Sequence, residues 1–341
     1  TPPLVLEAAR RALDERPMSY TAALGLDELR TAIARHYQER FGVRIDPARV
    51  VPTAGSSAAL LLTLSALLDE GQEVLQADPS YPCNRHIARS LGITSRAVPV
   101  GPERGFQLDA ELASAAWSER VGAILVGSPA NPTATLVPRA VLGGLADLAR
   151  ERGASLIVDE LYQGLVYEGA DYTALECADD AFVISGFSKY FQMTGFRLGW
   201  LVAPPEYVRP IERLAQNLYI APSTLAQYAA LAAFEPATLE LLEARRRELD
   251  ERRLYLLERL PQLGFAVPAR PQGAFYVYAD ASQLASDSFE LCRRLLEEAH
   301  VALTPGRDFG RVGCERWVRF AYTQPLGRLR EACERLERAL S

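Results

Sequence analysis

Several features that define special classes of protein are scarce in this sequence of 341 residues. It has five cysteines, an odd number, and no two of them form a Cys-x-x-Cys pair, so the pattern is neither a disulfide framework nor a zinc site. The three histidines, at positions 36, 86 and 300, are too scattered to form a metal cluster, and we expect no metal. Such cysteine usage fits a reducing compartment, and we expect a cytoplasmic location.

Other absences narrow the range of partners. The formal net charge is -6, and binding to a phosphate backbone needs a basic face, so we expect no nucleic-acid partner. No apolar run is long enough to span a bilayer and no signal peptide is recognisable, so we expect no membrane association. The chain opens on Thr1-Pro2-Pro3 and runs directly into a helical pattern, and we expect that a leading segment is missing.

The composition is that of a globular protein with more than one hydrophobic core. Apolar residues make up 49% of the chain and charged residues 23%. A chain of 341 residues exceeds the size at which one core usually stops growing, so we expect two domains. The boundaries that we predict are a helical arm over 1–40, a large domain over 41–240 and a small C-terminal domain over 241–341.

Short apolar strands alternate with amphipathic helices along the first two thirds of the chain. This pattern predicts an α/β fold with a mostly parallel, seven-stranded sheet covered by helices on both faces. We expect strands at 49–52, 73–77, 94–98, 123–127, 155–159, 181–185 and 198–202, and helices at 4–16, 26–41, 57–68, 84–91, 109–117, 138–150 and 205–218. A long charged helix at 239–260 then leads to a smaller α+β unit. We expect its strands near 264–267, 274–279 and 317–322, and its helices at 287–299 and 325–340.

Polar and special residues follow the predicted strands at their carboxyl ends. Ligands of open parallel sheets bind outside these ends, so the sequence predicts a single active site there. The residues are Ala54-Gly55-Ser56, Asp78 to Tyr81, Ser128 to Thr133, Asp159-Glu160 and Ser188-Lys189.

The strongest chemical signal is Lys189, which follows an apolar strand and a serine-rich turn and has Arg197 eight positions later. A lone lysine in a loop is usually a solvated surface charge. A lysine in a partly desolvated cleft, however, loses part of its preference for the ammonium form and can form an imine with an aldehyde. A nearby arginine offers a bidentate clamp for a phosphate group.

The string SGFSKYFQMTGFRLGW resembles the lysine motif of the class I/II (fold type I) pyridoxal-phosphate aminotransferases, of the aspartate-aminotransferase type. The resemblance implies pyridoxal 5'-phosphate as the cofactor and the PLP-transferase fold type I. It implies that Lys189 is the catalytic Schiff-base lysine, that Arg197 binds the cofactor phosphate, and that Ser188 is the serine adjoining the lysine in the cofactor site. The family often has serine where this chain has Gly186, so the resemblance leaves a phosphate contact of Ser185 open.

Two further motifs carry residues that the family uses on the cofactor ring. Asp159 ends an apolar strand, where a carboxylate is either a helix cap or a catalytic group. The resemblance implies that Asp159 pairs with the pyridine nitrogen, so that the ring can withdraw electrons, and that Tyr162 donates to the phenolic oxygen. The alternative for Tyr162 is packing on the next helix. Asn131, in an Asn–Pro turn, matches the family's asparagine that bonds the phenolic oxygen and faces the substrate carboxylate.

The remaining cofactor contacts come from three segments. The resemblance places the phosphate on Ala54, Gly55 and Ser56, although an ordinary helix N-cap would look the same in the sequence. It gives Tyr81 the role of stacking on the pyridine ring, where the alternative is a core aromatic. It also implies that Tyr20 reaches the phosphate of a neighbouring subunit, so that two active sites are shared across a homodimer.

Arg319 lies inside a predicted apolar strand, which is costly unless the arginine is paired or faces water at a sheet edge. The resemblance implies that Arg319 grips the substrate α-carboxylate. An acidic side chain would need a second cation, and the segment from Leu214 to Ala226, where some relatives have one, has none. We therefore expect a neutral or aromatic amino donor, with Arg85 and His86 as further candidates for polarity near the site.

Taken with the resemblance, the sequence predicts a dimeric aminotransferase whose substrates are an amino acid and a 2-oxo acid. Two alternatives remain open. One is a C–S β-lyase of the same fold, and the other is a non-catalytic regulatory module that binds pyridoxal phosphate. Product analysis separates them, because transfer gives an oxo acid only with an acceptor, whereas elimination gives ammonia and pyruvate.

Overall fold

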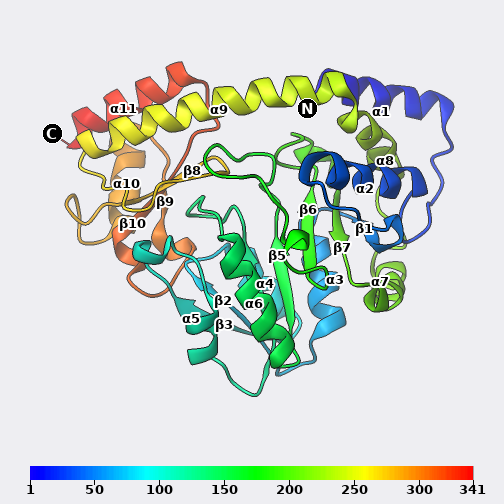
Figure 1. The fold of residues 1–341 in the computed structure, drawn as a ribbon. Coiled ribbons are helices and arrows are strands. Elements are labelled where there is room, and N and C mark those ends of the chain that lie inside the picture. The colour runs from blue at the N-terminus through cyan, green and yellow to red at the C-terminus, as the bar shows by residue number, and fades with distance from the viewer. Residues whose placement is uncertain (341) are drawn as a thin grey trace.

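The computed structural model describes residues 1–340 and contains a seven-stranded sheet in the order β1-β7-β6-β5-β4-β2-β3 (Figure 1). Its strands are β1 (Val50–Thr53), β2 (Glu73–Asp78), β3 (Thr94–Pro99), β4 (Val121–Gly127), β5 (Ser155–Asp159), β6 (Phe182–Gly186) and β7 (Gly199–Val202). Pairing is parallel from β6 through β5, β4 and β2 to β3, and β7 is antiparallel to both β1 and β6. The predicted α/β fold with a mostly parallel sheet is confirmed.

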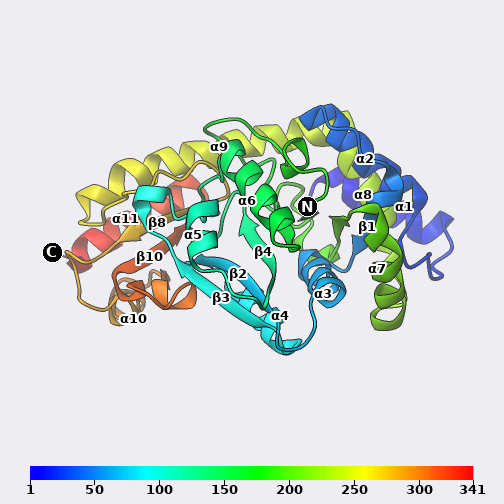
Figure 2. The same cartoon turned by 60° about the horizontal axis from the view of Figure 1, so that its bottom comes forward.

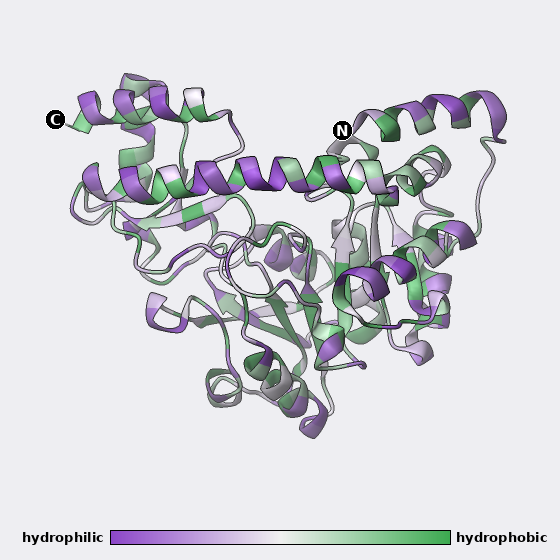
Figure 3. Cartoon of the chain, turned by 45° about the horizontal axis from the view of Figure 1, so that its top comes forward, coloured by the Kyte–Doolittle hydropathy of each residue, from purple (hydrophilic) through white to green (hydrophobic). Residues whose placement is uncertain are grey.

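Helices cover both faces of this sheet. On one face pack α3 (Ser56–Leu67), α4 (Pro82–Ser90) and α7 (Pro205–Leu218), and on the other α2 (Asp27–Phe41), α5 (Ala110–Ala115) and α6 (Arg139–Glu151) (Figure 2). Neighbouring strand residues such as Ile157 and Val158 therefore enter different core clusters, and both are fully buried. This two-sided burial explains why central strands such as β4 and β5 are nearly continuous apolar runs, green in Figure 3, whereas the edge strand β3 is mostly exposed or half-buried.

The helix α9 (Pro236–Gln262) crosses the molecule from the side of α1 (Pro3–Glu15) and α8 (Thr224–Leu231) to the small C-terminal unit (Figure 1). That unit has a three-stranded antiparallel sheet in the order β8-β10-β9, made of β8 (Tyr276–Asp280), β9 (Thr304–Pro305) and β10 (Trp317–Ala321). Its helices are α10 (Ser288–Ala299) and α11 (Leu326–Leu340).

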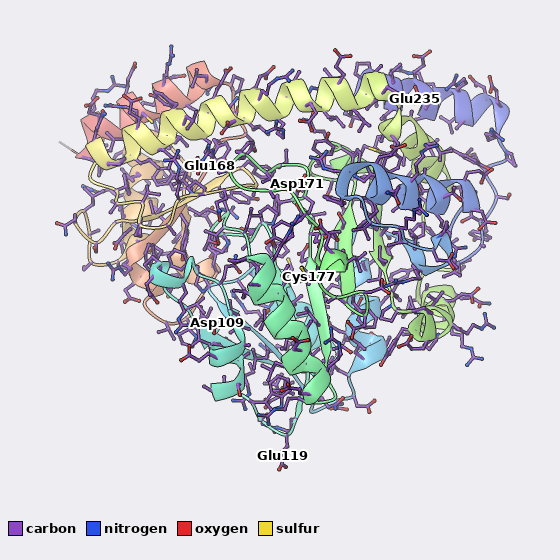
Figure 4. The ribbon with its side chains drawn as sticks, viewed as in Figure 1. Asp109, Glu119, Glu168, Asp171, Cys177 and Glu235 are labelled. Atoms are coloured by element: carbon purple, nitrogen blue, oxygen red, sulfur yellow. The ribbon has the colours of Figure 1, made fainter. Side chains whose placement is uncertain are left out.

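Ion pairs fasten α9 to the segment that follows β5. Arg253 on α9 pairs with Glu168 at 2.8 Å, and Arg40 on α2 pairs with Asp171 at 2.6 Å and with Glu243 on α9 at 3.5 Å. Figure 4 shows Glu168 and Asp171 on the segment beneath α9. Because Arg253 is buried, this pairing satisfies a charge that would otherwise be costly inside the protein.

Three details of the predicted element pattern are wrong. The strand expected at 264–267 is reduced to an isolated bridge between Ala266 and Asp280, and neither α8 nor the short strand β9 was expected. The long charged helix predicted at 239–260 is confirmed as α9. In the part of the chain that the structure describes, no helix is long and apolar enough to cross a membrane.

Candidate active site

A cavity of about 380 Å³ lies at the carboxyl ends of β2, β4, β5 and β6. Parallel strands bring these ends to one edge of the sheet, and residues that are far apart in the chain meet there. Nine of the residues singled out in the sequence line it: Ser56, Tyr81, Asn131, Asp159, Tyr162, Ser188, Lys189, Arg197 and Arg319.

Lys189 and Asp159 both line this cavity, and the charge of each influences the pKa of the other. Burial lowers the pKa of the Lys189 amine, with smaller contributions from Arg197 and Arg319, while Asp159 opposes the shift. Burial raises the pKa of the Asp159 carboxyl to about 6, although the backbone N–H of Leu161 donates to it at 3.0 Å. The site thus holds an amine with a weakened preference for its charged form and a carboxylate that gains from a positive partner.

One end of the cavity is an anion cradle formed by the start of α3 and Arg197. A Cβ on Gly55 would lie 2.8 Å from Nη2 of Arg197, so the guanidinium stands directly over this turn. Ala58 and Ala59 donate their N–H groups to Gly55, while the N–H groups of Ser56 and Ser57 have no acceptor within residues 1–340. Free N–H groups at a helix start, beside an arginine, are a phosphate site. Ala54 and Gly55 belong to this turn but do not line the cavity wall.

Close backbone packing explains the glycine at position 186. Gly186 on β6 pairs with Gly199 on β7, and a Cβ on Gly186 would lie 3.1 Å from the Cα of Gly199. Gly199 in turn lies directly against the turn of Gly55 and Ser56. The buried Ser185 hydroxyl donates to the backbone oxygen of Glu160 at 3.3 Å, and Ser185 does not line the cavity.

The opposite end of the cavity contains Arg319 on β10. Its Nη1 donates to Oδ1 of Asn131 at 2.8 Å, and its guanidinium carbon lies 4.1 Å from the ring centre of Tyr276 and 4.7 Å from that of Phe309. Nε of Arg319 is buried without a partner among the described residues. An arginine held between two rings with unused donors can bind a carboxylate.

Tyrosines complete the wall of the cavity near Lys189. The hydroxyls of Tyr162 and Tyr276 are 2.9 Å apart, and the Lys189 amine lies 5.7 Å from the centre of the Tyr162 ring. Burial raises the pKa of both tyrosines, so each keeps its proton and can donate it in a hydrogen bond. Tyr81 also keeps its proton, because burial and the neighbouring Cys83 raise its pKa.

Sequence reasoning missed other residues that line the cavity, among them Asn84, Phe106 and Gln107. Asn84 could have been found as one turn beyond Tyr81 on α4. The others carry no local signal, because they reach the cavity only through tertiary packing.

Three candidates do not contribute to the cavity of this chain. Tyr20 is 78% exposed and lies outside it. Arg85 donates instead to the backbone oxygens of Asp308 and Phe309, at 2.6 and 3.4 Å, and so fastens α4 to the C-terminal unit. His86 is exposed.

Comparisons with known proteins agree with this architecture. The family described as Aminotransferase class I and II matches residues 1–336, so the chain belongs to the class I and II aminotransferases, whose cofactor is pyridoxal phosphate. A curated relative from Mycobacterium tuberculosis, named valine–pyruvate aminotransferase, is 40% identical over 98% of this chain and 87% of its own. An aspartate/prephenate aminotransferase of Thermus thermophilus is 37% identical over 100% of this chain and 88% of its own.

Solved structures give the same result. A crystal structure of an aminotransferase from Mycobacterium tuberculosis superposes with a TM-score of 0.96, at 39% identity, over 99% of this chain and 88% of the other. The aspartate aminotransferase of Thermus thermophilus with maleate gives a TM-score of 0.94 at 36% identity, over 99% of this chain and 88% of the other. The protein is an aminotransferase that uses pyridoxal phosphate, and its substrates are an amino acid and an oxo acid.

Proposed function

We propose that Lys189 is the amine that binds the cofactor covalently and that the cavity transfers the amino group of a neutral amino acid to a 2-oxo acid. The observation that carries the proposal is that one cavity is lined by Lys189, by the carboxylate of Asp159 and by two arginines at opposite ends. The residues fit the cofactor, because the anion cradle at Arg197 suits its phosphate and Asp159 suits a protonated ring nitrogen.

When bound, the cofactor supplies an electron-withdrawing ring that stabilises negative charge on the Cα of the donor. Asp159 would hold the ring nitrogen in its protonated form, since a carboxylate in a dry site is stabilised by a positive partner. Tyr162 and the free amide donors of Asn131 would bind the phenolic oxygen, Tyr81 would stack on the ring, and Ser188 would contribute a further hydroxyl.

The same residues define how the substrate is held and how its proton moves. Arg319 would bind the α-carboxylate through donors that Asn131 leaves free. Nζ of Lys189 would then remove the α proton as a general base, for which a lowered pKa is the appropriate tuning. Beyond Lys189, the cations that line the cavity within residues 1–340 are Arg197 and Arg319, so no further cation is left for an acidic side chain.

We also propose a homodimer with shared active sites and a cytoplasmic location. The segment of Met18 and Tyr20 is fastened to α8 by a hydrogen bond from Thr224 to the backbone oxygen of Ser19 at 2.8 Å. Met18, Tyr20, Leu218 and Ile220, in the two chain segments that precede α2 and α8, are 44–78% exposed, and exposed apolar side chains that form a patch are typical of an interface between subunits. The cytoplasmic location is supported by five cysteines that are all free of disulfides.

The proposal is tested by the absorption spectrum of the purified protein with pyridoxal phosphate, before and after addition of amino acids, beside a Lys189→Ala variant. We expect a visible cofactor band in the parent that neutral donors bleach, and no such response in the variant. A protein that never acquires the band refutes the role of Lys189. Ammonia and pyruvate released without an oxo-acid acceptor would show the β-lyase reaction instead.

A further inference from the structure

We propose that Gln107 determines which side chain the amino donor carries, by presenting its amide oxygen as a hydrogen-bond acceptor inside the cavity. The class of substrate selected in this way is a neutral amino acid whose side chain has an O–H or N–H donor. This inference rests on the proposed function of the same cavity.

The orientation of the Gln107 amide is fixed by Thr135. Nε2 of Gln107 lies 3.0 Å from the backbone oxygen of Thr135 and 2.9 Å from its Oγ1. The backbone oxygen can only accept, and Thr135 gives its own hydroxyl proton to the backbone oxygen of Gly105 at 2.7 Å. Both contacts therefore require a donor on the glutamine, so the nitrogen faces Thr135 and the oxygen faces away.

The free atom of this amide opens to the cavity. Gln107 is 6% exposed and lines the cavity, and Oε1 receives no hydrogen bond from residues 1–340. Oε1 is also absent from the described polar atoms that are both fully covered and unpartnered. It consequently retains accessible surface, and the space that it reaches is the cavity.

Gln107 belongs to the end of the cavity where the substrate would bind. Its anchor, Thr135, comes four residues after Asn131, which bonds Arg319. The adjoining Phe106 packs edge-on against Trp317 and Tyr278, with ring centres 5.1 and 5.6 Å apart. Trp317 and Arg319 share β10, and Tyr278 is the partner of Arg319 in the sheet, whereas the phosphate cradle at Arg197 contacts none of these residues.

The oriented amide oxygen of Gln107 would distinguish amino donors by the charge of their side chain and by whether that side chain has an O–H or N–H group. Phe106, Pro79 and Pro129 add apolar surface to the cavity, and Arg319 would already hold the α-carboxylate, so a side-chain carboxylate beside Gln107 would face an amide oxygen without a further cation. A hydroxyl or amide side chain would instead pair with Oε1. Sites that hydrogen-bond a substrate group disfavour the analogue lacking it, because the polar atom of the protein is then left unpaired.

The test compares amino donors of matched shape in the half-reaction of the holoenzyme, followed by bleaching of the cofactor band. The pairs are L-threonine with L-valine, L-glutamine with L-methionine, and L-tyrosine with L-phenylalanine. We expect kcat/KM to favour the donor-bearing member of at least one pair by about tenfold, the value of one hydrogen bond. L-Glutamate should be poorer than L-glutamine by a larger factor.

A Gln107→Met variant assigns the preference to this residue. The preference for the donor-bearing member should fall to about twofold or less, because methionine keeps the side-chain volume but offers no amide oxygen to that donor. Gln76→Met is the matched control, because Gln76 is a buried glutamine on β2 outside the cavity, and its preference should equal that of the parent.

The possible outcomes distinguish a failure of the proposed role of Gln107 from a failure of the proposed aminotransferase function. A parent enzyme that transaminates all three pairs without preference refutes the role of Gln107 and needs no variant. A preference for the donor-bearing amino acid that persists in Gln107→Met also refutes the role of Gln107. If no amino acid bleaches the parent, the proposed function itself is wrong.

Discussion

At the scale of single residues, burial disfavours the negative charge of Asp159, although the proposed role of this carboxylate requires that charge. Burial raises the pKa of its carboxyl to about 6, whereas an unfolded aspartate has a pKa of about 3.9. A raised folded-state pKa means that the contribution of the carboxyl to stability is complete below pH 4 and is lost as the pH rises through 6. At neutral pH the buried charge of Asp159 therefore lowers the free energy of unfolding of the cofactor-free protein. A protonated ring nitrogen of the cofactor would offset this cost.

We predict that Asp159→Asn stabilises the cofactor-free protein at pH 7.5 and lowers transamination severely. The gain in the free energy of unfolding should grow from near zero at pH 4 to a plateau above pH 6. Two pKa units at 1.36 kcal/mol each set an upper limit of about 3 kcal/mol, and the loss of a partner for Lys189 reduces it. Urea unfolding of both proteins at pH 4.5, 5.5 and 7.5 measures the difference, and a difference independent of pH would contradict the assigned cause.

At the scale of elements, we propose that the turn between β1 and α3 binds the cofactor phosphate and needs a residue without a side chain at Gly55. The backbone of Gly55 has a φ of +89°, and a Cβ there would lie 2.8 Å from Nη2 of Arg197. Gly71 has nearly the same φ, +85°, but a Cβ there would meet nothing within 4 Å. Substitution of either glycine by alanine would therefore strain the backbone, but only substitution of Gly55 would also displace Arg197.

We predict that Gly55→Ala and Gly71→Ala each cost about 1–3 kcal/mol of stability, the penalty of a positive φ for alanine. Only Gly55→Ala should weaken the binding of pyridoxal phosphate, by about tenfold or more, because it moves Arg197 away from the phosphate. Thermal unfolding and fluorescence titration with the cofactor provide both numbers. Equal cofactor affinities in the two variants would refute the cradle.

Some strands, helices and site residues could be predicted from the sequence, and others could not. Most strands of the large sheet are buried and nearly continuous apolar runs, so they could be predicted from the sequence. The helix α8 is short and its residues are mostly apolar, so it lacks the amphipathic pattern that marked the others. Lys189, Asp159 and Asn131 lie in local motifs and could be found. The amide of Gln107 is oriented by Thr135, and the hydroxyl of Tyr276 contacts that of Tyr162, and only the folded chain contains these contacts.

At the scale of the whole molecule, we propose a division into a helical arm over 1–40, a large cofactor-binding domain over 41–240 and a small domain over 241–341. The boundary at 240/241 falls within α9, the helix that spans both units. The cavity lies between them, because Arg319 comes from the small sheet and Asp159 from the large one. One chain therefore supplies residues from both units to the cavity, whereas Tyr20 lies outside it.

We propose that the exposed Tyr20 contacts the cofactor phosphate in the site of another subunit, and hybrid dimers test this arrangement. We predict that Tyr20→Phe weakens cofactor affinity by about tenfold, the loss of one hydrogen bond to a charged group. If sites are shared, a dimer of one Tyr20→Phe chain and one Lys189→Ala chain contains one site with both substitutions and one with neither.

The mixture should consequently regain sites with the parental cofactor affinity, although neither variant alone has any. Random re-association of equal amounts makes half of the dimers hybrid, and each hybrid has one parental site, so about a quarter of all sites should be restored. If Tyr20 served the site of its own chain, every site in the hybrid would carry one substitution and none would be parental. Titrating activity of the mixed and unmixed proteins with pyridoxal phosphate distinguishes the two arrangements, because only shared sites produce a component that saturates at the parental concentration.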